Sequence, residues 1–348
     1  MLSFIMTCLG WVLNLFYKII GNYGFAIIVF TVFIKLVLFP LDLKQRRSMA
    51  KTQKIQPLMM EIQKKYANDK DKLNQETMKL YQKYGINPMG GCLPMLIQFP
   101  IIIALYWVVR KPIVYMMGVG FEDTWRVAEA FNAWAASAAP EALGKLADII
   151  PVTYQKAMSA NSFGNNEIQI AQMLFDHSEI LQHPAILSWG KTINPINFSF
   201  FGMNLADTPN FGALLGLFSG QAVSASTALL WSIPVLSGLS AWFSSYLTRP
   251  QQPKKDKNIV LAENEKEQEK TGAGADTMKT MTTIMPLFSA WFAFTLPAAI
   301  GLYWTVSNVI QIVQHFYVKK VFNNDISLED LEGDIKNVKS RKKRKKSR

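Results

Sequence analysis

The feature that most constrains this chain is an almost wholly apolar stretch from Tyr23 to Pro40, which contains a single charged residue, Lys35. At about 1.5 Å per residue, a helix of this length crosses most of a bilayer core of about 30 Å. Thr31 lies four residues before Lys35, so both side chains project from one face of such a helix. A lysine at the centre of a span costs about 2.5–3.5 kcal/mol. The other spans are therefore expected to give Lys35 wet or partnered surroundings.

A second interpretation of Lys35 follows from its position. It lies shortly before Pro40, where we expect the helix to end, so its long side chain can reach the headgroups instead. Position alone does not separate a snorkelling lysine from a polar pocket. The pattern of the remaining spans, described next, favours the pocket.

Apolar and charged residues are segregated along the chain. It has 348 residues, of which 50% are hydrophobic, and a formal net charge of +12. Long uncharged spans beside lysine-rich segments are typical of a polytopic, all-α membrane protein. The two cysteines and three histidines are scattered, so we expect neither a disulfide nor a metal site, and no cofactor.

Ten segments follow from hydropathy and charge. We expect an interfacial amphipathic helix (1–20), a first span (23–40), a basic helical hairpin (41–91), a second span (92–110), an outer segment (111–222), a third span (223–247), a polar loop (248–278), a fourth span (279–296), a fifth span (297–318) and a basic tail (319–348).

Residues 1–20 allow three arrangements. Their apolar and small or polar positions both recur every three to four residues, which favours a helix lying in the membrane interface. A cleaved signal peptide is less well supported, because the stretch lacks a basic start and a small-residue cleavage site. The third arrangement is a helical hairpin that turns through Gly21 and Asn22.

The segment 41–91 carries two narrow apolar stripes with helical spacing. The first consists of Ile55, Leu58, Ile62 and Tyr66, and the second of Leu73, Thr77, Leu80 and Tyr84. A polar break at residues 68–71 separates them, so two antiparallel helices with a short turn are expected.

The outer segment 111–222 is less regular. We expect helix near residues 126–150 and irregular structure near residues 161–166. Residues 198–201 and 204–205 are apolar enough to dip toward the membrane interface. The sequence assigns this segment no chemistry.

Charge predicts the orientation of the spans. The segment 41–91 and the tail each contain eleven basic and five acidic residues, whereas the outer segment has nine acidic and five basic ones. With five spans, the segment 41–91 and the tail lie on the same side of the membrane, which the positive-inside rule makes cytoplasmic. Arg110 and Lys111 run mildly against this assignment.

Three motifs resemble the YidC family of membrane protein insertases, in its bacterial form with a short N-terminus. They are YGFAIIVFTVFIKLVLFPL, KLYQKYGINPMGGCLPMLIQFPIIIALY and MKTMTTIMPLFSAWFAFTLPAAIGLYWTVSNVIQIVQ. The resemblance covers the hairpin and all five spans. It implies a hydrophilic groove between the spans that opens to the cytoplasm and to lipid and is closed to the outside.

The same resemblance implies which residues form the groove. Lys35 occupies the place of a positive residue that is usually arginine, so the charge is kept but the planar fork is lost. Thr31 and Gln98 match polar groove positions, and Trp304, with Tyr303 beside it, matches an aromatic position that contacts substrate. The long outer segment departs from the family, where this connection is usually shorter.

The expected function is insertion of newly made proteins into a bacterial plasma membrane, with the C-terminus in the cytoplasm. Lys35 would attract acidic flanks of nascent membrane proteins, and the hairpin and the tail, which ends RKKRKKSR, would bind the ribosome or anionic lipid. The alternative is a membrane transporter with an anion-binding lysine, although no internal repeat is evident. No enzyme activity and no small-molecule substrate are expected, and participation of a Sec-type channel stays open.

Overall fold

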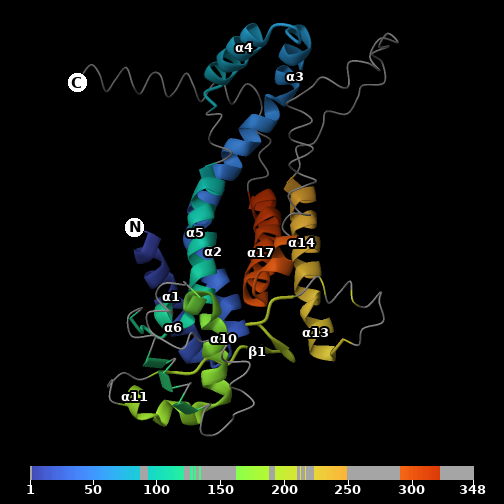
Figure 1. Ribbon diagram of the computed structural model, residues 1–348. Helices are drawn as coiled ribbons and strands as arrows, with labels where there is room; N and C mark the ends of the chain where they lie inside the picture. Colours follow the sequence, from blue (N-terminus) through green and yellow to red (C-terminus); the bar gives the residue numbers. More distant parts are fainter. Residues whose placement is uncertain are drawn as a thin grey trace, which may run out of the picture. The chain divides into compact units, whose positions relative to one another are not determined.

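The computed structural model is mostly helical (Figure 1). It describes residues 2–86, 93–120, 126–127, 129–130, 133–134, 162–187, 193–209, 212, 216, 223–248 and 291–321. The chain divides into two compact units, which are described separately. The first comprises residues 1–35, 99–241 and 287–310, and the second comprises residues 36–98, 242–286 and 311–348.

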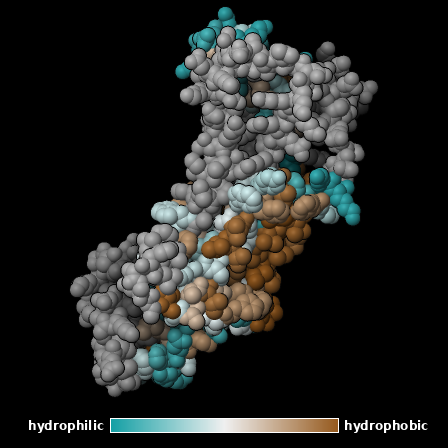
Figure 2. Space-filling model, turned by 90° about the vertical axis from the view of Figure 1, so that its right-hand side faces the viewer, coloured by the Kyte–Doolittle hydropathy of each residue, from teal (hydrophilic) through white to brown (hydrophobic). Residues whose placement is uncertain are grey.

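The chain is a membrane-integral protein. Three described helices are long and apolar enough to cross a membrane, and a shorter apolar helix covers Phe99–Arg110; the three are Leu2–Ile20, Tyr23–Thr52 and Ala225–Leu247. Apolar side chains also stay exposed on these helices, as lipid contact allows. Figure 2 shows a broad hydrophobic patch on the side that carries helix α14 (Ser232–Thr248), which exposes Val235, Leu236, Leu239, Trp242 and Phe243.

Helix α2 runs from Tyr23 to Lys54 and contains Pro40 in its interior. The expectation that the helix ends at Pro40 is therefore wrong. Proline removes one backbone hydrogen bond, but membrane helices tolerate this loss where neighbouring groups satisfy the freed carbonyl. The polar residues after Pro40 thus belong to the same helix as Lys35.

Helix α1 (Leu2–Ile20) folds back against α2. Gly21, with a φ of 75°, forms the turn, and the Phe16 ring lies 5.7 Å from the Phe33 ring. This contact fits the helical hairpin through Gly21 and Asn22. An interfacial position for residues 1–20 stays a prediction. On its other side α1 meets helix α6 (Pro112–Tyr115), where a Cβ on Gly10 would lie 2.3 Å from the Tyr115 carbonyl oxygen.

The outer segment contains helix α10 (Ser162–Asp176), the 3₁₀ helix η3 (Ser178–Gln182), helix α11 (Pro184–Leu187) and a small antiparallel β-hairpin, β1 (Ser199–Phe200) and β2 (Met203–Asn204). The expectation of irregular structure at residues 161–166 is wrong, since α10 begins at Ser162. Burial of Ile170, Ala171 and Leu174 along one side of α10 outweighs the poor helix propensity of its first turn. Most of residues 126–150 lie outside the described residues.

The remaining spans are helix α5 (Leu93–Arg110), helix α13 (Ala225–Leu230) followed by α14, and helix α17 (Ala298–Val321). Of the fourth span, 279–296, only the helical residues 291–295 and Leu296 are described. The core of the first unit combines large buried side chains from several helices, among them Leu13, Tyr23, Ile27, Phe30, Leu105, Phe198, Ile300 and Tyr303.

In the second unit, helices α3 (Gln56–Lys65) and α4 (Lys70–Lys83) are joined by residues 66–69. Asp69 caps α4 by accepting a hydrogen bond from the Lys72 amide at 3.0 Å. The stripes expected from the sequence contribute to one small core, which consists of Ile55, Leu58, Met59, Ile62, Leu80, Tyr81, Tyr84 and Ile86. The loop at 248–278 and the tail after Val321 lie outside the described residues.

Glu167 is a buried acidic residue whose carboxyl group joins α10 to α6. Its Oε1 accepts a hydrogen bond from the Val114 amide at 2.8 Å, and its Oε2 is buried with no hydrogen-bond partner among the described residues. Burial raises the pKa of Glu167 to about 8, against the opposing effects of the backbone amides and Lys111. The side chain is therefore protonated at neutral pH and ionises only in mildly alkaline solution.

We expect Gly24→Ala to destabilise the fold by about 1–3 kcal/mol, because a Cβ there would lie 2.2 Å from the Phe200 ring. The measurement is the thermal unfolding midpoint in detergent. Val29→Ala, on the exposed side of α2, is the control and should have little effect. Phe200→Ala should cost less in the Gly24→Ala background than in the parent; equal costs would contradict the contact.

Glu167 should make stability fall with rising pH. A carboxyl with a folded-state pKa near 8 and an ordinary unfolded-state pKa near 4.5 favours folding fully below pH 4.5, and this contribution is lost as pH rises through 8. The slope in that window is at most about 1.4 kcal/mol per pH unit. Glu167→Gln should flatten the pH dependence of thermal unfolding, whereas Glu129→Gln should not. An unchanged slope in the first variant would count against a buried acid.

Candidate functional site

Lys35 lies at the edge of the exposed apolar face of α2, about a third of a turn from the centre of that face. Exposed apolar residues follow that face along the helix: Phe25, Val29, Val32, Phe33, Leu36 and Val37. Lys35 itself is partly buried, and Thr31, one turn earlier, is fully buried. Thr31 therefore turns away from the apolar side that would meet lipid, whereas Lys35 lies at the edge of that side.

The other sequence-predicted residues are distributed over α2, α5 and α17. The Thr31 hydroxyl donates to the Ile27 carbonyl at 2.6 Å, so its polar group is satisfied within its own helix. Tyr303 is buried in the same core as Ile27. Trp304 is partly buried, with its ring 6.5 Å from the Phe292 ring. Gln98 belongs to α5, but its side chain lies outside the described residues.

Two polar pairs between α14 and α17, here called the polar seam, were not predicted: Ser240 with Asn308 in the first unit, and Ser244 with Gln311 in the second. The Asn308 amide donates to the Ser240 hydroxyl at 3.2 Å, and the Ser244 hydroxyl donates to Gln311 at 3.2 Å. Buried Ser237 precedes Ser240 by one turn. Serines spaced three and four apart on an apolar helix were the available signal, because this spacing aligns them on one face.

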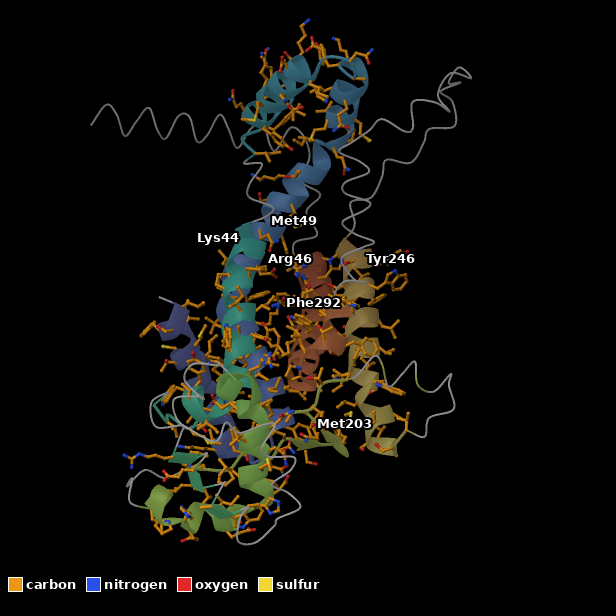
Figure 3. The ribbon with its side chains drawn as sticks, viewed as in Figure 1. Lys44, Arg46, Met49, Met203, Tyr246 and Phe292 are labelled. Atoms are coloured by element: carbon orange, nitrogen blue, oxygen red, sulfur yellow. The ribbon has the colours of Figure 1, made fainter. Side chains whose placement is uncertain are left out.

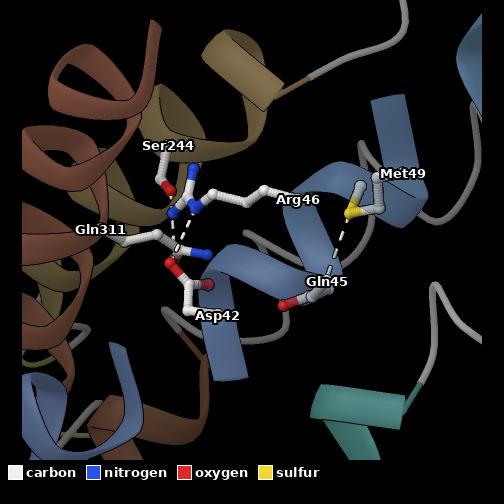
Figure 4. A network of polar contacts seen from close by, with 6 residues as sticks. All are labelled: Asp42, Gln45, Arg46, Met49, Ser244 and Gln311. Atoms are coloured by element: carbon white, nitrogen blue, oxygen red, sulfur yellow. Dashed lines mark hydrogen bonds and ion pairs between the residues drawn. The ribbon is translucent and has the colours of Figure 1, made fainter. Parts of the chain in front are cut away.

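A second polar cluster lies in the second unit, where α2 continues past Pro40 (Figure 3). The Arg46 guanidinium Nε donates to Asp42 at 2.7 Å, and both side chains are largely buried. Figure 4 shows Arg46 pointing toward the pair formed by Ser244 and Gln311. The Phe39 ring lies 6.1 Å from the Tyr317 ring, which places α2 beside α17 here. The ion pair keeps a basic side chain in a mostly protein environment.

Residues 193–209, here called the strap, connect the ends of several membrane helices. The Tyr17 hydroxyl donates to the Pro195 carbonyl at 3.2 Å and accepts from the Asn197 amide at 2.8 Å. The Asn22 amide donates to the Ser199 carbonyl at 3.0 Å. The strap therefore holds the corner between α1 and α2.

The strap also caps α17. The amides of Ala298 and Ala299, at the start of that helix, donate to the carbonyls of Asp207 and Leu205 at 2.8 and 3.1 Å. The Ser232 hydroxyl, at the start of α14, donates weakly to Met203 Sδ at 3.9 Å, and Figure 3 shows Met203 beside α13. First-turn amides lack partners within their own helix, so these contacts both satisfy and position the helix ends.

These arrangements support binding and positioning more than covalent chemistry. The described residues contain no group of three or more His, Cys, Asp and Glu side chains that could hold a metal ion. What α2 and the seam offer instead is a cation and several amide and hydroxyl groups within apolar helices. Such groups can attract and solvate charged or polar segments.

Comparison with known proteins gives consistent matches. The model of the family described as 60Kd inner membrane protein matches residues 15–325. A protein named membrane protein insertase YidC from Thioalkalivibrio sulfidiphilus is 49% identical over 113 residues, which are 32% of this chain and 20% of the relative. A protein of the same name from Fusobacterium nucleatum is 49% identical over 106 residues, which are 30% of this chain and 52% of the relative. The matches thus span from a fifth to about half of these relatives.

We expect the hydrogen bond between Asn308 and Ser240 to stabilise the packing of α17 on α14 by about 0.6 kcal/mol, and by at most about 1.7 kcal/mol. A double-mutant cycle with Asn308→Leu and Ser240→Ala measures it through unfolding in detergent or bicelles. The control cycle replaces Asn308→Leu with Thr305→Val, because the Thr305 hydroxyl donates to Gly301 of its own helix. Additive effects in the first cycle would contradict the pairing.

Proposed function

Because the chain belongs to the 60Kd inner membrane protein family, we propose that it is a membrane protein insertase that uses Lys35 to draw polar flanks of newly made proteins into the membrane. The family assignment rests on a match over most of the chain. The observation that supports the mechanism is the partly buried position of Lys35 at the edge of the exposed apolar face of α2.

The physical problem is the cost of moving a polar flank through hydrocarbon. Charges and backbone groups lose water there, and each unsatisfied group costs several kcal/mol. A hydrophilic groove between the five spans, open to the cytoplasm and to lipid, shortens the dry path. Lys35 attracts an acidic flank more strongly there than it would in bulk water. Meanwhile the apolar part of the client moves along apolar helix faces into the lipid.

Several residues support this groove. Thr31 and Gln98 belong to α2 and α5, and Tyr303 and Trp304 to α17. The polar seam adds amide and hydroxyl groups on α14 and α17. We propose that these residues form the walls of the groove, and that the strap closes its outer end by joining α1, α2 and α17. No covalent step is required, so the protein is not an enzyme and needs no cofactor.

The partners follow from charge. Nascent membrane proteins with acidic flanks are the clients, and lipid lies beside the exposed apolar faces. We propose that the hairpin of α3 and α4 and the tail ending RKKRKKSR face the cytoplasm of a bacterial cell and bind ribosomal RNA through phosphate contacts. A Sec-type channel is not required by this mechanism.

The test is insertion of small single-span clients into proteoliposomes, measured by protease protection of the translocated flank. Lys35→Ala should reduce insertion of a client with an acidic flank at least severalfold and leave a neutral-flank client nearly unchanged, because the lost attraction is worth about 1–4 kcal/mol. Lys35→Arg should retain activity. Lys44→Ala removes an exposed charge from the same helix and is the matched control.

Equal losses for acidic and neutral clients would contradict attraction by Lys35. If the protein inserts neither client but takes up labelled small anions in a Lys35-dependent way, the transporter with an anion-binding lysine is correct instead. Insertion and anion uptake are measured in the same vesicles. A protein that is simply inactive therefore fails both assays, whereas a transporter fails only the insertion assay.

A further inference from the structure

The tip of the β-hairpin carries an exposed aromatic side chain. Of the apolar residues that the sequence predicted near the membrane interface, Phe198 and Leu205 are fully buried in the core of the first unit, and Phe200 is only 7% exposed. Phe201, by contrast, is 73% exposed. The fold therefore leaves one ring of this group available for a contact outside the chain, and the proposed insertion mechanism does not use it.

The backbone of the turn makes a phenylalanine at this position unexpected. The hairpin pairs Phe200 with Met203, so Phe201 and Gly202 are the two central residues of the turn. Their φ angles are 49° and 78°, and both residues therefore lie in the left-handed region. Glycine and asparagine adopt this region readily, whereas phenylalanine does so at a cost in conformational free energy. A large apolar side chain held exposed at such a cost points to a contact that the ring makes with a partner.

Phe201 lies beside the starts of two apolar helices. Its ring is 6.0 Å from that of Phe25, the third residue of α2, which is itself exposed. Its neighbour Gly202 lies close to exposed Leu229 of α13, because a Cβ on Gly202 would be 4.0 Å from Leu229 Cδ1. Both helices open segments that are long and apolar enough to cross a membrane: Tyr23–Thr52 and Ala225–Leu247. The exposed ring is therefore continuous with surfaces that meet lipid, at the level where these spans begin.

The hairpin is fixed to the start of α2. The Asn22 side chain donates to the Ser199 carbonyl at 3.0 Å and accepts from the Phe25 amide at 3.2 Å, so one residue both caps α2 and holds the hairpin. The Phe200 ring lies 5.3 Å from that of Phe25 and 4.6 Å from that of Phe201. The depth of the Phe201 ring in a membrane is therefore set by the depth of α2.

The size and polarity of the tip favour a membrane interface over a folded protein as its partner. One phenylalanine side chain contributes about 150–250 Å², whereas a stable protein interface buries at least about 1,000 Å² in total. The next pair of the hairpin, Ser199 with Asn204, is polar and reaches the surface, which suits hydrated headgroups. Irregular backbone is not tolerated against hydrocarbon, so the turn stays at the headgroup level while its ring reaches the acyl chains.

We propose that Phe201 inserts its ring into the bilayer leaflet around the start of α2, among the acyl chains just below the headgroups, and that it thereby anchors the strap to the membrane surface. Lipid is the occupant of this surface. Because the strap caps α17 and holds the corner of α1 and α2, the same contact ties these helix ends to the bilayer. The contact requires no client and no insertion activity.

The test measures the depth of position 201 in a bilayer. The full-length protein with Cys8→Ser, Cys92→Ser and Phe201→Cys carries a nitroxide spin label at residue 201 and is placed in vesicles of phosphatidylethanolamine and phosphatidylglycerol. Electron paramagnetic resonance compares collisions of the label with oxygen, which concentrates in hydrocarbon, and with a water-soluble nickel chelate. Collisions with oxygen should exceed those with the chelate, because the label takes the place of a ring among acyl chains.

Two further labelled positions bracket the expected depth. Val29→Cys lies one turn after Phe25 on the exposed side of α2, and its label should collide still more with oxygen and less with the chelate. Glu179→Cys replaces an exposed charged residue of η3 in the same outer segment, and its label should collide mainly with the chelate. A collision ratio at residue 201 equal to that at residue 179 would overturn the proposal.

A label at Leu229→Cys leaves Phe201 in place and stays informative if residue 201 does not tolerate substitution. Because Leu229 lies beside the tip, its label should also collide mainly with oxygen. A label at residue 229 that collides mainly with the chelate would place the tip in water and overturn the proposal.

A photo-crosslinking arm keeps an aromatic ring at residue 201 and identifies its occupant. Phe201 is replaced by the photoreactive analogue benzoylphenylalanine in the otherwise unchanged chain. Adducts formed in the same vesicles, with and without a client present, are identified by mass spectrometry. Phospholipid adducts in both conditions are expected. Adducts with the client, or with a second copy of the chain, in place of lipid would overturn the assignment of lipid as the occupant.

Discussion

The strap is the constraint on which the first unit depends. Helices that end within or beside a membrane leave unpaired amides, and a membrane offers little water to satisfy them. Here one irregular segment supplies carbonyls to the first amides of α17 and pairs with side chains at the corner of α1 and α2. Phe200 packs directly on Gly24 of α2, where no larger residue fits. Helix position and backbone satisfaction are therefore achieved by the same contacts.

This arrangement gives the outer segment a structural reason to exist. The sequence shows a long connection of mixed composition with no recognisable chemistry. In the structure its buried residues join the core formed by the spans, and the carboxyl group of Glu167 accepts a hydrogen bond from the Val114 amide of α6. A connection that packs in this way fixes the ends of the membrane helices that it contacts.

Much of the fold could be predicted from the sequence, and the failures have identifiable causes. The described apolar stretches of the sequence are helical in the structure, and five of the eight residues predicted to form the hairpin stripes belong to one small core: Ile55, Leu58, Ile62, Leu80 and Tyr84. The sequence does not reveal that α2 continues through Pro40, because proline usually ends a helix. It does not reveal the start of α10 either, because the local helix propensity there is poor and the stabilising burial depends on distant residues. The strap could not have been predicted, because Tyr17 and Pro195 are 178 residues apart and composition does not encode such pairings.

The site was predictable in a more limited sense. The common face of Thr31 and Lys35 follows from their spacing, and its role in a groove stays a prediction. Tyr303 and Trp304 were identified only through family resemblance. The partners of Asn308 and Gln311 were hidden because serines on α14 resemble ordinary small residues until the second helix is placed.

The strap also limits how the membrane helices can respond to the lipid around them. It holds the Tyr23 end of α2, because the Asn22 amide donates to the Ser199 carbonyl and Phe200 packs on Gly24. A change in membrane thickness would therefore be absorbed by tilting of the tied helices together or by deformation of the surrounding bilayer, and not by movement of this end of α2 alone.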